Sequence, residues 1–565
     1  MIKQISGSQM ISEALHEEGV EIVFGYPGGA ALNIYDETYK QTYFKHILVR
    51  HEQAAVHAAD GYARVSGKVG VAFVTSGPGF TNAVTGLATA YSDSIPVVLI
   101  SGQVPTFMIG TDAFQEIDAV GISRPCVKHN FLVNSVEELP RIIKEAFYIA
   151  RSGRPGPVHI DIPKNVTSRL GDFVYPKEIS IPSYKPTYKG NSKQIKKAAA
   201  AINEAKRPLL YIGGGAVASN ASEIIRKFMK KTGIPAVETL MALGVLDAKD
   251  KLNLGMAGMH GSYASNMALS ECDLLISLGA RFCDRVTGKT DEFAKHAKII
   301  HIDIDPSSIS KIINAHYPIV GDLTNVLSEL YEEVKGEPKN YAPWREILDR
   351  YQKLNPLGYT DSDKVLKPQW VVEETAKIVG PEAIIATDVG QHQMWVAQFY
   401  PFNRARQLVT SGGLGTMGYG LPAAIGAKCA MPEHLVVNFT GDGSILMNIQ
   451  ELMTAYETNV PVINIILNNN FLGMVRQWQT FFYEKRYSST DLSLQPDFVK
   501  IAEGFGGVGF VCNSKDEFKK ALKEAIKSKK SALIDFRIDR FEDLLPMVPA
   551  GAAIYNMILK SKEEK

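Results

Sequence analysis

Short apolar runs alternate along the chain with longer segments in which apolar residues recur at helical spacing. The clearest runs are VGVAFVTSG (69–77), IPVVLISG (95–102), RPLLYIGGG (207–215), KIIHIDID (298–305), HLVVNFTGDG (434–443) and VPVINIIL (460–467). Runs of this length predict strands that are buried on both faces, and the segments between them predict helices. The alternation therefore indicates βαβ units with parallel sheets, which is an α/β fold class.

Two stretches interrupt this alternation, residues 171–192 and 336–344. Both are rich in proline and polar residues and lack a clear apolar period, as linkers do. At about 150 residues per domain, a chain of 565 residues has room for three or four hydrophobic cores. We expect three doubly wound parallel-sheet domains followed by a C-terminal tail, with approximate bounds 1–175, 190–335, 365–540 and 541–565.

The first and third of these domains share a sequence repeat. TSGPGF…TAYSDSIPVVLISG aligns with FTGDGS…TAYETNVPVINIILNN. Gly77 falls on Gly441 at an offset of 364 (441 − 77), and Pro96 falls on Pro461 at an offset of 365 (461 − 96). A shared TAY and a shared proline at nearly constant offset favour common descent over chance likeness of two strand–helix–strand units. The copies differ at Asp442, where the first copy has a proline.

Charge and cysteine content exclude several classes of protein. The chain has 61 basic and 60 acidic side chains, a net charge of +1, so no long-range field attracts nucleic acid or an anionic membrane surface. The five cysteines form no C-x-x-C pair and no cluster at metal spacing, which indicates free thiols in a reducing compartment. The N-terminus lacks a signal-peptide core, and no apolar stretch approaches roughly 18 residues. We therefore expect a soluble, cytoplasmic protein.

Oxygen-bearing side chains follow two neighbouring runs of the third domain. Asp442 comes after LVVNFT, and Asn468–Asn470 come after VINIIL. Because the carboxyl ends of parallel strands meet at one sheet edge, these side chains should converge there as an oxygen set that suits Mg2+. Gly441 and Gly443 let the backbone approach a phosphate, and we expect the helix after Ser444 to direct its N-terminus at it. Turn formation is the competing explanation, since Gly-Asp-Gly and runs of Asn are common in turns.

The spacing of these residues carries a resemblance to a known family. GDG followed, 27 positions after Asp442 (469 − 442), by the asparagine pair at Asn469 resembles the fingerprint of thiamine-diphosphate-dependent enzymes, and the likeness covers nearly the whole chain. It implies that Asp442, Asn469 and the main-chain carbonyl of Phe471 bind Mg2+. Met417 matches the bulky residue that bends the cofactor. The full set of implied cofactor contacts is Gly390, Gln391, His392, Met417, Gly441, Gly443, Ser444 and Met474.

Glu52 is the residue that we predict to transfer protons. RHEQAAVHAADGYAR (50–64) places Glu52 after the short run HILV, at the start of an alanine-rich helix. Burial there favours the protonated acid and suits a proton shuttle, whereas a glutamate at a helix N-terminus can also simply complement the helix dipole. HEQAA is similar to the family's activating-glutamate motif, which implies that Glu52 acts on the aminopyrimidine of the cofactor. In the family this glutamate and the metal site meet across a subunit interface, which implies a homodimer or tetramer.

Seven further segments narrow the resemblance. They are GYPGGAAL (25–32), GTDAFQE (110–116), GRPGPVHIDIPK (153–164), GMAGMHG (255–261), LGARFCDR (278–285), NNNFLGMVRQWQ (468–479) and VPAGAA (548–553). Together they resemble the catalytic subunits of biosynthetic acetohydroxyacid synthase (acetolactate synthase). The resemblance implies that pyruvate is decarboxylated and that its hydroxyethyl unit passes to pyruvate or 2-ketobutyrate, giving 2-acetolactate or 2-aceto-2-hydroxybutyrate for valine, leucine and isoleucine biosynthesis. It also implies a possible small regulatory subunit.

The same resemblance assigns a substrate pocket. Its implied residues, besides Glu52, are Gly29, Phe114, Gln115, Lys164, Arg285 and Trp478. The Gln115 amide would hydrogen-bond a developing oxyanion, and Arg285 would bind the second substrate's carboxylate as a planar fork. Trp478 would form an apolar wall that favours the extra methylene of 2-ketobutyrate, a selection worth about 1–3 kcal/mol. A core indole is the simpler explanation of such a residue.

The middle domain also fits a nicotinamide-dependent oxidoreductase. GGGAVA (213–218) matches G-x-G-x-x-A, but we expect no acid to end the second strand at the spacing that the nicotinamide fingerprint requires. The resemblance instead implies FAD without net redox work, in a central domain between a pyrimidine-binding and a diphosphate-binding domain. The implied FAD contacts are Arg154, Gly213, Gly214, Gly215, Met259, His260, Gly279, Arg281 and Asp322. Cys283 departs from most members of the family, which carry an acid at this position.

Three rival functions differ from this one in features that can be checked. A catabolic acetolactate synthase would share Glu52 and Asp442 but lack the R-F-x-D-R segment and bind no flavin. A pyruvate oxidase would bind FAD and reduce it during turnover. A non-enzymatic module would have no reason to keep a metal-binding set and a proton-shuttling carboxylate in two domains.

Overall fold

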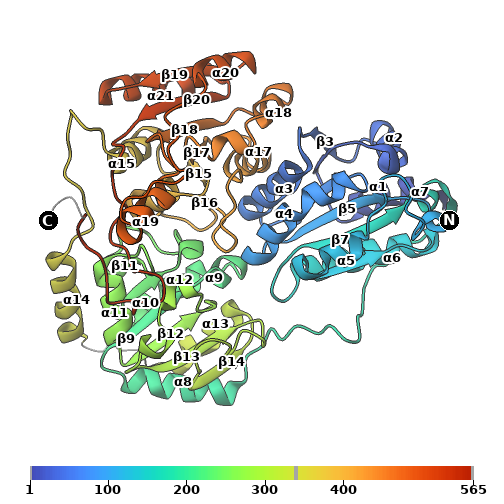
Figure 1. Cartoon of the computed structure of the whole chain (residues 1–565). Helices are drawn as coiled ribbons and strands as arrows, with labels where there is room; N and C mark the ends of the chain where they lie inside the picture. The colour runs from blue at the N-terminus through green and yellow to red at the C-terminus, as the bar shows by residue number, and fades with distance from the viewer. Residues whose placement is uncertain (1–2, 336–340, 562–565) are drawn as a thin grey trace.

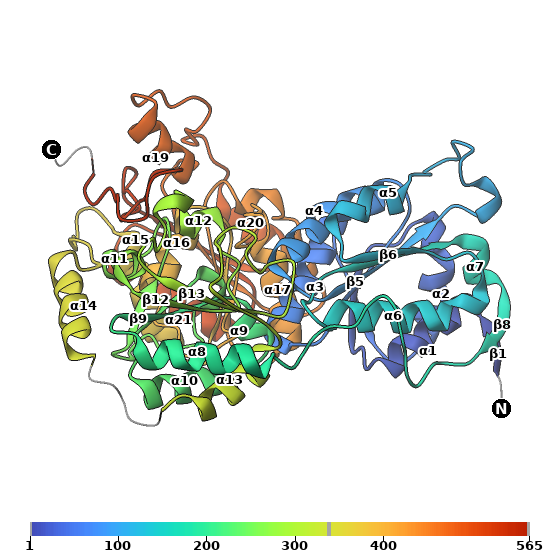
Figure 2. The ribbon, with the colours of Figure 1, turned by 90° about the horizontal axis from the view of Figure 1, so that it is seen from below.

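The computed structural model describes residues 3–335 and 341–561. Three six-stranded sheets form the cores of three domains, and helices flank each sheet (Figure 1). The N-terminal domain stands to one side, while the central and third domains pack against each other (Figure 1, Figure 2). The predicted α/β class with three doubly wound parallel sheets is confirmed. Among the described residues, no helix is both long and apolar enough to cross a membrane.

The N-terminal and third sheets have the same strand order, as the sequence repeat predicts. Numbered along each domain, the order is 2-1-3-4-6-5 in both. The N-terminal sheet runs β3 (Lys45–Leu48), β2 (Ile22–Gly25), β4 (Gly70–Val74), β5 (Val97–Gln103), β7 (Val158–Pro163), β6 (His129–Leu132). The third sheet runs β16 (Leu408–Val409), β15 (Ile384–Thr387), β17 (Val436–Thr440), β18 (Ile463–Asn468), β20 (Ala532–Arg537), β19 (Val508–Cys512). The repeated segments form the third and fourth strands of each sheet.

The central sheet has a different order, 3-2-1-4-5-6. It runs β11 (Asn253–Met256), β10 (Ala236–Glu238), β9 (Pro208–Ile212), β12 (Leu274–Leu278), β13 (Lys298–Asp303), β14 (Tyr317–Val320), and every pair is parallel. This order is that of dinucleotide-binding domains, in which the ligand crevice lies where the strand order reverses, here between β9 and β12.

The helices follow the apolar periodicity of the sequence. In α6 (Leu139–Arg151) the buried residues include Ile142, Ile143, Ala146 and Ala150, which lie on one face of a 3.6-residue helix. Other long helices of the first two domains are α1 (Gly7–Glu17), α2 (Leu32–Lys40), α3 (Glu52–Ser66), α4 (Pro78–Asp93), α8 (Ser192–Glu204), α10 (Ser222–Thr232), α11 (Tyr263–Glu271) and α13 (Leu323–Glu333). Those of the third domain are α15 (Pro368–Val379), α16 (Gln391–Phe399), α17 (Gly420–Ala430), α19 (Gly473–Phe482) and α21 (Lys515–Ser528).

Both predicted linkers contain regular structure. The first begins inside strand β8 (Leu170–Phe173), which pairs antiparallel with β1 (Lys3–Ser6). In the second, residues 336–340 lie outside the described residues, and the rest leads into helix α14 (Ala342–Leu354). Its proline occupies the first helical turn, where the missing N–H costs nothing, and Trp344 is buried with Nε1 donating to Pro208 O at 3.1 Å. Residues 174–191 contain no helix or strand, so regular structure enters the first stretch only at its two ends, through β8 and α8.

The C-terminal segment is packed rather than solvated, contrary to the predicted tail. It leaves β20 and crosses to the central domain (Figure 1). Leu544 is buried in the core of the third domain, and Val548 and Ile554 belong to the central core. Residues Met547 and Ile558 pair across a short antiparallel bridge. This segment thus ties the third domain to the central one.

Two glycines allow α3 and α17 to pack closely between the N-terminal and third domains. A Cβ at Gly426 would lie 1.8 Å from Ala58 O, and one at Gly61 would lie 2.1 Å from Ala423 O. We predict that Gly426→Ala lowers the free energy of unfolding by about 1–3 kcal/mol or more, because the overpacked helices must separate. Gly504→Ala, at the end of α20 (Phe498–Gly504) with open space around it, is the control. A melting temperature unchanged in Gly426→Ala would contradict this packing.

Candidate functional site

The loops after three strands of the third sheet meet at one edge. Residues 388–391 follow β15, residues 441–444 follow β17, and residues 469–471 follow β18. These strands are neighbours, and the strand order reverses between β15 and β17. Open α/β sheets bind ligands at such a point, outside the carboxyl ends of the strands. The predicted metal and diphosphate segments therefore lie at one edge of one sheet.

Asp442 is a buried charged group of this edge. It is only 2% exposed, and burial raises the pKa of its carboxyl to about 7. The amide of Gln495 donates to one carboxylate oxygen and also to Asn468 Oδ1 at 3.2 Å. Arg537 favours the charged form, but desolvation outweighs it. A divalent cation would offset this desolvation, so Asp442 fits the role of a metal ligand.

Asn469 and Phe471 add neutral oxygens beside it. Asn469 is buried; its Oδ1 accepts from Phe471 N at 3.1 Å, and its Nδ2 donates to Gln391 Oε1 at 3.2 Å. In the part of the chain that the structure describes, no group of three or more His, Cys, Asp or Glu side chains could hold a metal ion. A metal here would depend on one carboxylate with amide and main-chain oxygens. That ligand set fits Mg2+.

His392 and three glycines line the predicted diphosphate loops. The Nε2 atom of His392 is buried and finds no hydrogen-bond partner among the described residues. Burial lowers the pKa of the ring to about 3, so the imidazole is neutral. Gly441 and Gly443 are enclosed, since added Cβ atoms would lie 3.0 Å from His392 Nδ1 and 2.7 Å from Leu472 Cδ2 respectively, and Gly390 has a φ of 156°. An unsatisfied ring nitrogen beside bare backbone fits a polar ligand such as a diphosphate.

The predicted helix after Ser444 is wrong. The chain forms a 3-10 turn, η7 (Ile445–Met447), and the next helix, α18 (Glu451–Glu457), begins later. Asn448 interrupts the helical path with a φ of −136°, and its Nδ2 donates to Gly418 O at 2.7 Å. The Ser444 hydroxyl closes the loop instead by accepting from Gly441 N at 3.1 Å. Any phosphate contact here would come from loop and turn backbone.

Met417 lies in a segment that the N-terminal domain holds. Thr416 and Thr89 share a hydrogen bond of 2.7 Å between their hydroxyls, and the Asp93 carboxylate accepts from the backbone N–H of residues 412 and 413 at 3.0 and 2.7 Å. Met474 and Trp478 both lie on α19 and are partly exposed. The Nε1 atom of Trp478 is buried without a hydrogen-bond partner among the described residues.

Glu52 is the first residue of α3 and is partly buried. Its Oε2 accepts from Asn82 Nδ2 at 2.9 Å, and an added Cβ on Gly79 would lie 3.4 Å from Oε1. Glu52 follows β3 in the N-terminal sheet, whereas Asp442 follows β17 in the third sheet. Within the described parts of the chain, no hydrogen bond or ion pair joins the two carboxyls. The structure does not bring the predicted proton shuttle into contact with the predicted metal ligand in a single chain.

Four predicted substrate residues follow strands of the N-terminal sheet. Gly29 follows β2 and is exposed, while Lys164 follows β7 and begins α7 (Lys164–Ser168). Phe114 and Gln115 follow β5; Phe114 is 88% exposed, and Gln115 has a φ of 61°. The Gln115 carbonyl packs on Gly77, where a Cβ would lie 2.8 Å away. The structure therefore gathers these four residues and Glu52 at the carboxyl edge of one sheet.

Arg285 lies elsewhere, on α12 (Asp284–Thr287) of the central domain. Its side chain is 55% exposed and pairs with Asp284 at 3.4 Å. Arg285 lines a cavity of about 110 Å³ together with Met259 and with Val548 of the C-terminal segment. Met259 N donates to Arg285 O at 2.7 Å, and Val548 N donates to Met259 O at 2.8 Å. His260, next in sequence, is 6% exposed, and burial lowers its pKa to about 4.

The predicted FAD glycines meet at the reversal point of the central sheet. Gly213–Gly215 follow β9, and Gly279 follows β12 with a φ of 64°. A Cβ at Gly213 would lie 2.4 Å from Gly279 O, and one at Gly215 would lie 2.8 Å from Gly279 Cα. The two loops pack so tightly that only glycine fits, and they leave main-chain groups at the crevice of a dinucleotide-binding sheet.

Two arginines lie near this crevice. Arg281 retains solvent contact, but desolvation of its guanidinium, followed by the charge of Arg154, lowers its pKa. Arg154 pairs with Asp305 at 3.2 Å. Neighbouring guanidinium groups suit an anionic ligand such as the diphosphate of a dinucleotide. Asp322 has a structural role as the N-cap of α13, where it accepts from Asn325 N at 3.1 Å.

The expectation that no acid ends the second strand of the central sheet is wrong. Glu238 is the last residue of β10, 25 positions after Gly213 (238 − 213). Its carboxyl accepts from Leu246 N at 3.1 Å and from Asn253 Nδ2 at 3.0 Å. Burial raises the pKa of Glu238 to about 7. A nicotinamide-dependent enzyme would use such an acid to bind the ribose of the cofactor. The Glu238 carboxyl instead accepts its hydrogen bonds from groups of the protein itself.

Three polar residues near these edges were not predicted. Gln495 donates to Asp442, and Gln477 accepts from Gln391 Nε2 at 2.8 Å. Glu451 accepts from Arg50 N at 3.0 Å, just before α3, and burial raises its pKa to about 7. Gln477 lies next to Trp478 in the RQWQ run, and that neighbourhood is the only sequence feature that could have pointed to it. Gln495 and Glu451 lie outside every motif.

The amino-acid sequence matches models of three thiamine pyrophosphate enzyme domains. Residues 5–122 match the N-terminal TPP binding domain, residues 195–330 the central domain, and residues 388–536 the C-terminal TPP binding domain. These matches occur in the chain order of the three sheets. Fold and sequence together define the class as thiamine pyrophosphate enzymes.

Curated relatives resolve the family within this class. The chain is 48% identical to the acetolactate synthase large subunit of Haemophilus influenzae over the full length of both chains. It is 45% identical, also over both full lengths, to the acetolactate synthase isozyme 3 large subunit of Escherichia coli. It is 49% identical to the probable acetolactate synthase large subunit of Methanocaldococcus jannaschii, covering 98% of this chain and 95% of that one. The chain belongs to the acetolactate synthase large-subunit family, which confirms the predicted resemblance.

Proposed function

We propose that the chain is the catalytic subunit of a cytoplasmic acetolactate synthase. It would decarboxylate pyruvate and transfer the two-carbon hydroxyethyl unit to pyruvate or 2-ketobutyrate, in valine, leucine and isoleucine biosynthesis. Identity of 45–49% to large subunits of this name over nearly the whole chain carries the proposal. The buried oxygen set around Asp442 supports it, because a cofactor diphosphate needs a cation.

The cofactor edge of the third sheet would hold thiamine diphosphate and Mg2+. The bound cofactor supplies the nucleophilic carbon and the electron sink that decarboxylation and carbon–carbon bond formation require. Asp442, Asn469 and the carbonyl of Phe471 would ligate Mg2+. The diphosphate and thiamine contacts would come from Gly390, Gln391, His392, Met417, Gly441, Gly443, Ser444 and Met474.

Glu52 would hold the proton that activates the aminopyrimidine. Because Glu52 and Asp442 do not contact one another in one chain, we propose that the site forms between two chains of a homodimer or tetramer. Each site would then take Glu52 from one chain and Asp442 from another. Phe114 is a large aromatic side chain, 88% exposed at the same sheet edge as Glu52, which agrees with coverage by a second chain.

The substrate pocket would combine residues from all three domains. Lys164 would attract the pyruvate carboxylate, and the Gln115 amide would donate to the developing oxyanion beside Gly29 and Phe114. Arg285 would bind the carboxylate of the second substrate, a role that its exposed guanidinium allows. Trp478 would contact the alkyl group of that substrate.

The central domain would hold FAD without net redox work. The glycine loops after β9 and β12 and the two nearby guanidinium groups support this, because they suit a dinucleotide diphosphate. The proposed contacts are Arg154, Gly213, Gly214, Gly215, Met259, His260, Gly279, Arg281 and Asp322. The relatives are named large subunits, from which we propose a small regulatory partner.

Trp478→Leu is expected to reduce the preference for 2-ketobutyrate over pyruvate by about tenfold or more, since an apolar wall that contacts one methylene contributes that much discrimination. The ratio of 2-aceto-2-hydroxybutyrate to 2-acetolactate in a competition assay measures it. Phe482→Leu, an exposed aromatic on the same helix, is the control and should leave the ratio unchanged. An unaltered ratio in Trp478→Leu would remove this residue from substrate selection.

The proposed reaction is tested with 13C-labelled pyruvate, thiamine diphosphate and Mg2+. We expect labelled CO2 and 2-acetolactate, with two labelled substrate molecules contributing to each product molecule. Release of acetaldehyde or acetate as the sole organic product would contradict carboligation as the activity.

A further inference from the structure

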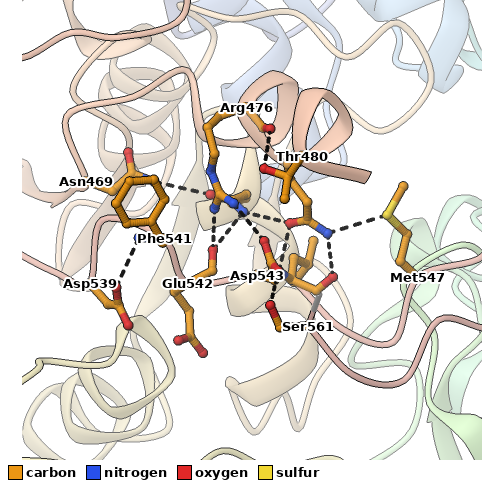
Figure 3. Close-up of polar contacts among 12 residues, drawn as sticks. Asn469, Arg476, Thr480, Asp539, Phe541, Glu542, Asp543, Met547 and Ser561 are labelled. Carbon is orange, nitrogen blue, oxygen red and sulfur yellow. Dashed lines mark hydrogen bonds and ion pairs between the residues drawn. The ribbon is translucent and has the colours of Figure 1, made fainter. Parts of the chain in front are cut away.

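Three buried carboxamides connect the proposed metal site to the C-terminal segment; Figure 3 labels Asn469 at the metal site and Glu542 and Met547 in that segment. Asn469 Nδ2 donates to Gln391 Oε1 at 3.2 Å, and Gln391 Nε2 donates to Gln477 Oε1 at 2.8 Å. None of the three residues is more than 5% exposed. A side-chain amide can rotate to exchange its oxygen and nitrogen, so each must be held to present one atom reliably.

Backbone groups fix the orientation of all three amides. Gln391 Nε2 also donates to Glu542 O at 3.2 Å, and a carbonyl can only accept. Gln477 Nε2 donates to Leu544 O at 2.9 Å, while its Oε1 accepts from Leu544 N at 2.8 Å. At the other end, Asn469 Oδ1 accepts from the N–H of residue 471 at 3.1 Å. Turning any one amide over would set oxygen against oxygen or N–H against N–H.

This arrangement also defines what the Gln391 side chain can do. Its two amide hydrogens are committed to Gln477 and to the Glu542 carbonyl. No donor remains for a phosphate, which only accepts hydrogen bonds. The Gln391 side chain therefore acts on Asn469, and a diphosphate contact by this residue would use its main-chain N–H.

Close packing holds the three amides in place. A Cβ at Gly473 would lie 2.1 Å from Gln391 Oε1 and 2.7 Å from Asn469 Nδ2, so the contact exists only because this residue has no side chain. The C-terminal segment is anchored separately: the buried guanidinium of Arg476 donates to Asp543 Oδ1 and to Glu542 O, both at 2.7 Å.

We propose that Gln477 is a positioning residue for the metal site. Together with Gln391 and the backbone of Glu542 and Leu544, it fixes the Asn469 amide with its nitrogen toward Gln391, which leaves the second lone pair of its oxygen to ligate a cation. The inference rests on the proposed function, in which Asn469 is a ligand of Mg2+. Gln477 contributes to cation affinity and touches neither substrate nor reacting atoms, so its loss affects Mg2+ dependence rather than the chemistry at saturation.

Two variants test this inference in different ways. Gln477→Met has similar volume but neither accepts from Gln391 nor bonds Leu544. Gly473→Ala keeps every hydrogen-bonding group yet pushes Gln391 away from Asn469. Asp543→Asn is the matched control, because it weakens the Arg476 anchor and keeps every hydrogen-bonding group of the three amides and of their backbone partners.

The measurement is a Mg2+ titration of thiamine diphosphate binding to the full chain, followed by tryptophan fluorescence, together with kcat at saturating Mg2+. We expect the Mg2+ dissociation constant to rise about 10- to 100-fold in Gln477→Met and Gly473→Ala, while it stays near the wild-type value in Asp543→Asn. The kcat at saturation should stay within about threefold of wild type in all three variants, as for loss of a positioning contact.

Wild-type Mg2+ affinity in folded Gln477→Met and Gly473→Ala would overturn the inference. An equal loss in Asp543→Asn would also overturn it, because the effect would then come from anchoring of the segment. If Gln477→Met does not fold, the Mg2+ affinity of Gly473→Ala tests the inference. Failure of the wild-type chain to bind Mg2+ and thiamine diphosphate would instead overturn the proposed function, so the two failures are distinguishable.

Discussion

Glu52→Gln is expected to lower pyruvate turnover by about 10²- to 10⁴-fold, the usual contribution of a positioned proton-transfer group. The amide cannot exchange a proton with the aminopyrimidine, but its oxygen can still accept from Asn82, which bonds Glu52 at 2.9 Å. The fold and the binding of thiamine diphosphate with Mg2+ should therefore be retained. Steady-state kinetics, circular dichroism and a binding titration measure the three properties in one preparation.

Glu17→Gln, an exposed residue of α1, is the matched control and should keep full activity. Turnover of Glu52→Gln close to that of the control would exclude Glu52 from proton transfer. Loss of folding instead would show that the carboxyl at the start of α3 is structural.

Asp442→Asn is expected to weaken Mg2+-dependent binding of thiamine diphosphate by at least about 100-fold. The substitution removes the charged metal ligand itself, whereas Gln477→Met removes only a residue that positions a ligand. The side chain is 2% exposed and is bonded by Gln495, so an amide of the same shape should be accommodated. Calorimetric titration with and without Mg2+ measures the change.

Asp516→Asn, on the exposed face of α21, provides the control for loss of one acidic charge. If Asp442→Asn bound the cofactor at the same Mg2+ concentration as the wild type, the metal site could not lie at this sheet edge.

The parts of this protein that follow from local patterns could be predicted from sequence. The offset between Gly77 and Gly441 predicted two related domains, and the structure gives their sheets the same strand order. The placement of Asp442 and Asn469 at one edge followed from the rule that parallel strands expose their carboxyl ends together. Periodicity, strand length and motif spacing are local quantities, so the sequence contains them directly.

The parts that depend on long-range packing could not be predicted. Val548 belongs to the central core, although it lies in the segment 541–565 that we expected to be a C-terminal tail. Gln477 acquires its role only because Leu544, 67 residues away, folds back onto α19. Asn448 ends a helical path through a bond to Gly418, 30 residues earlier in the chain. In each case the decisive partner is distant in sequence and carries no motif.

We propose that this chain is a carboligase and that a bound flavin would do no net redox work in it. The most direct test is pyruvate turnover with thiamine diphosphate and Mg2+, with and without FAD, recording 2-acetolactate, CO2 and flavin absorbance together. We expect 2-acetolactate only when FAD is present, with the flavin oxidised throughout. Formation of 2-acetolactate without FAD, or bleaching of the flavin during turnover, would contradict the account.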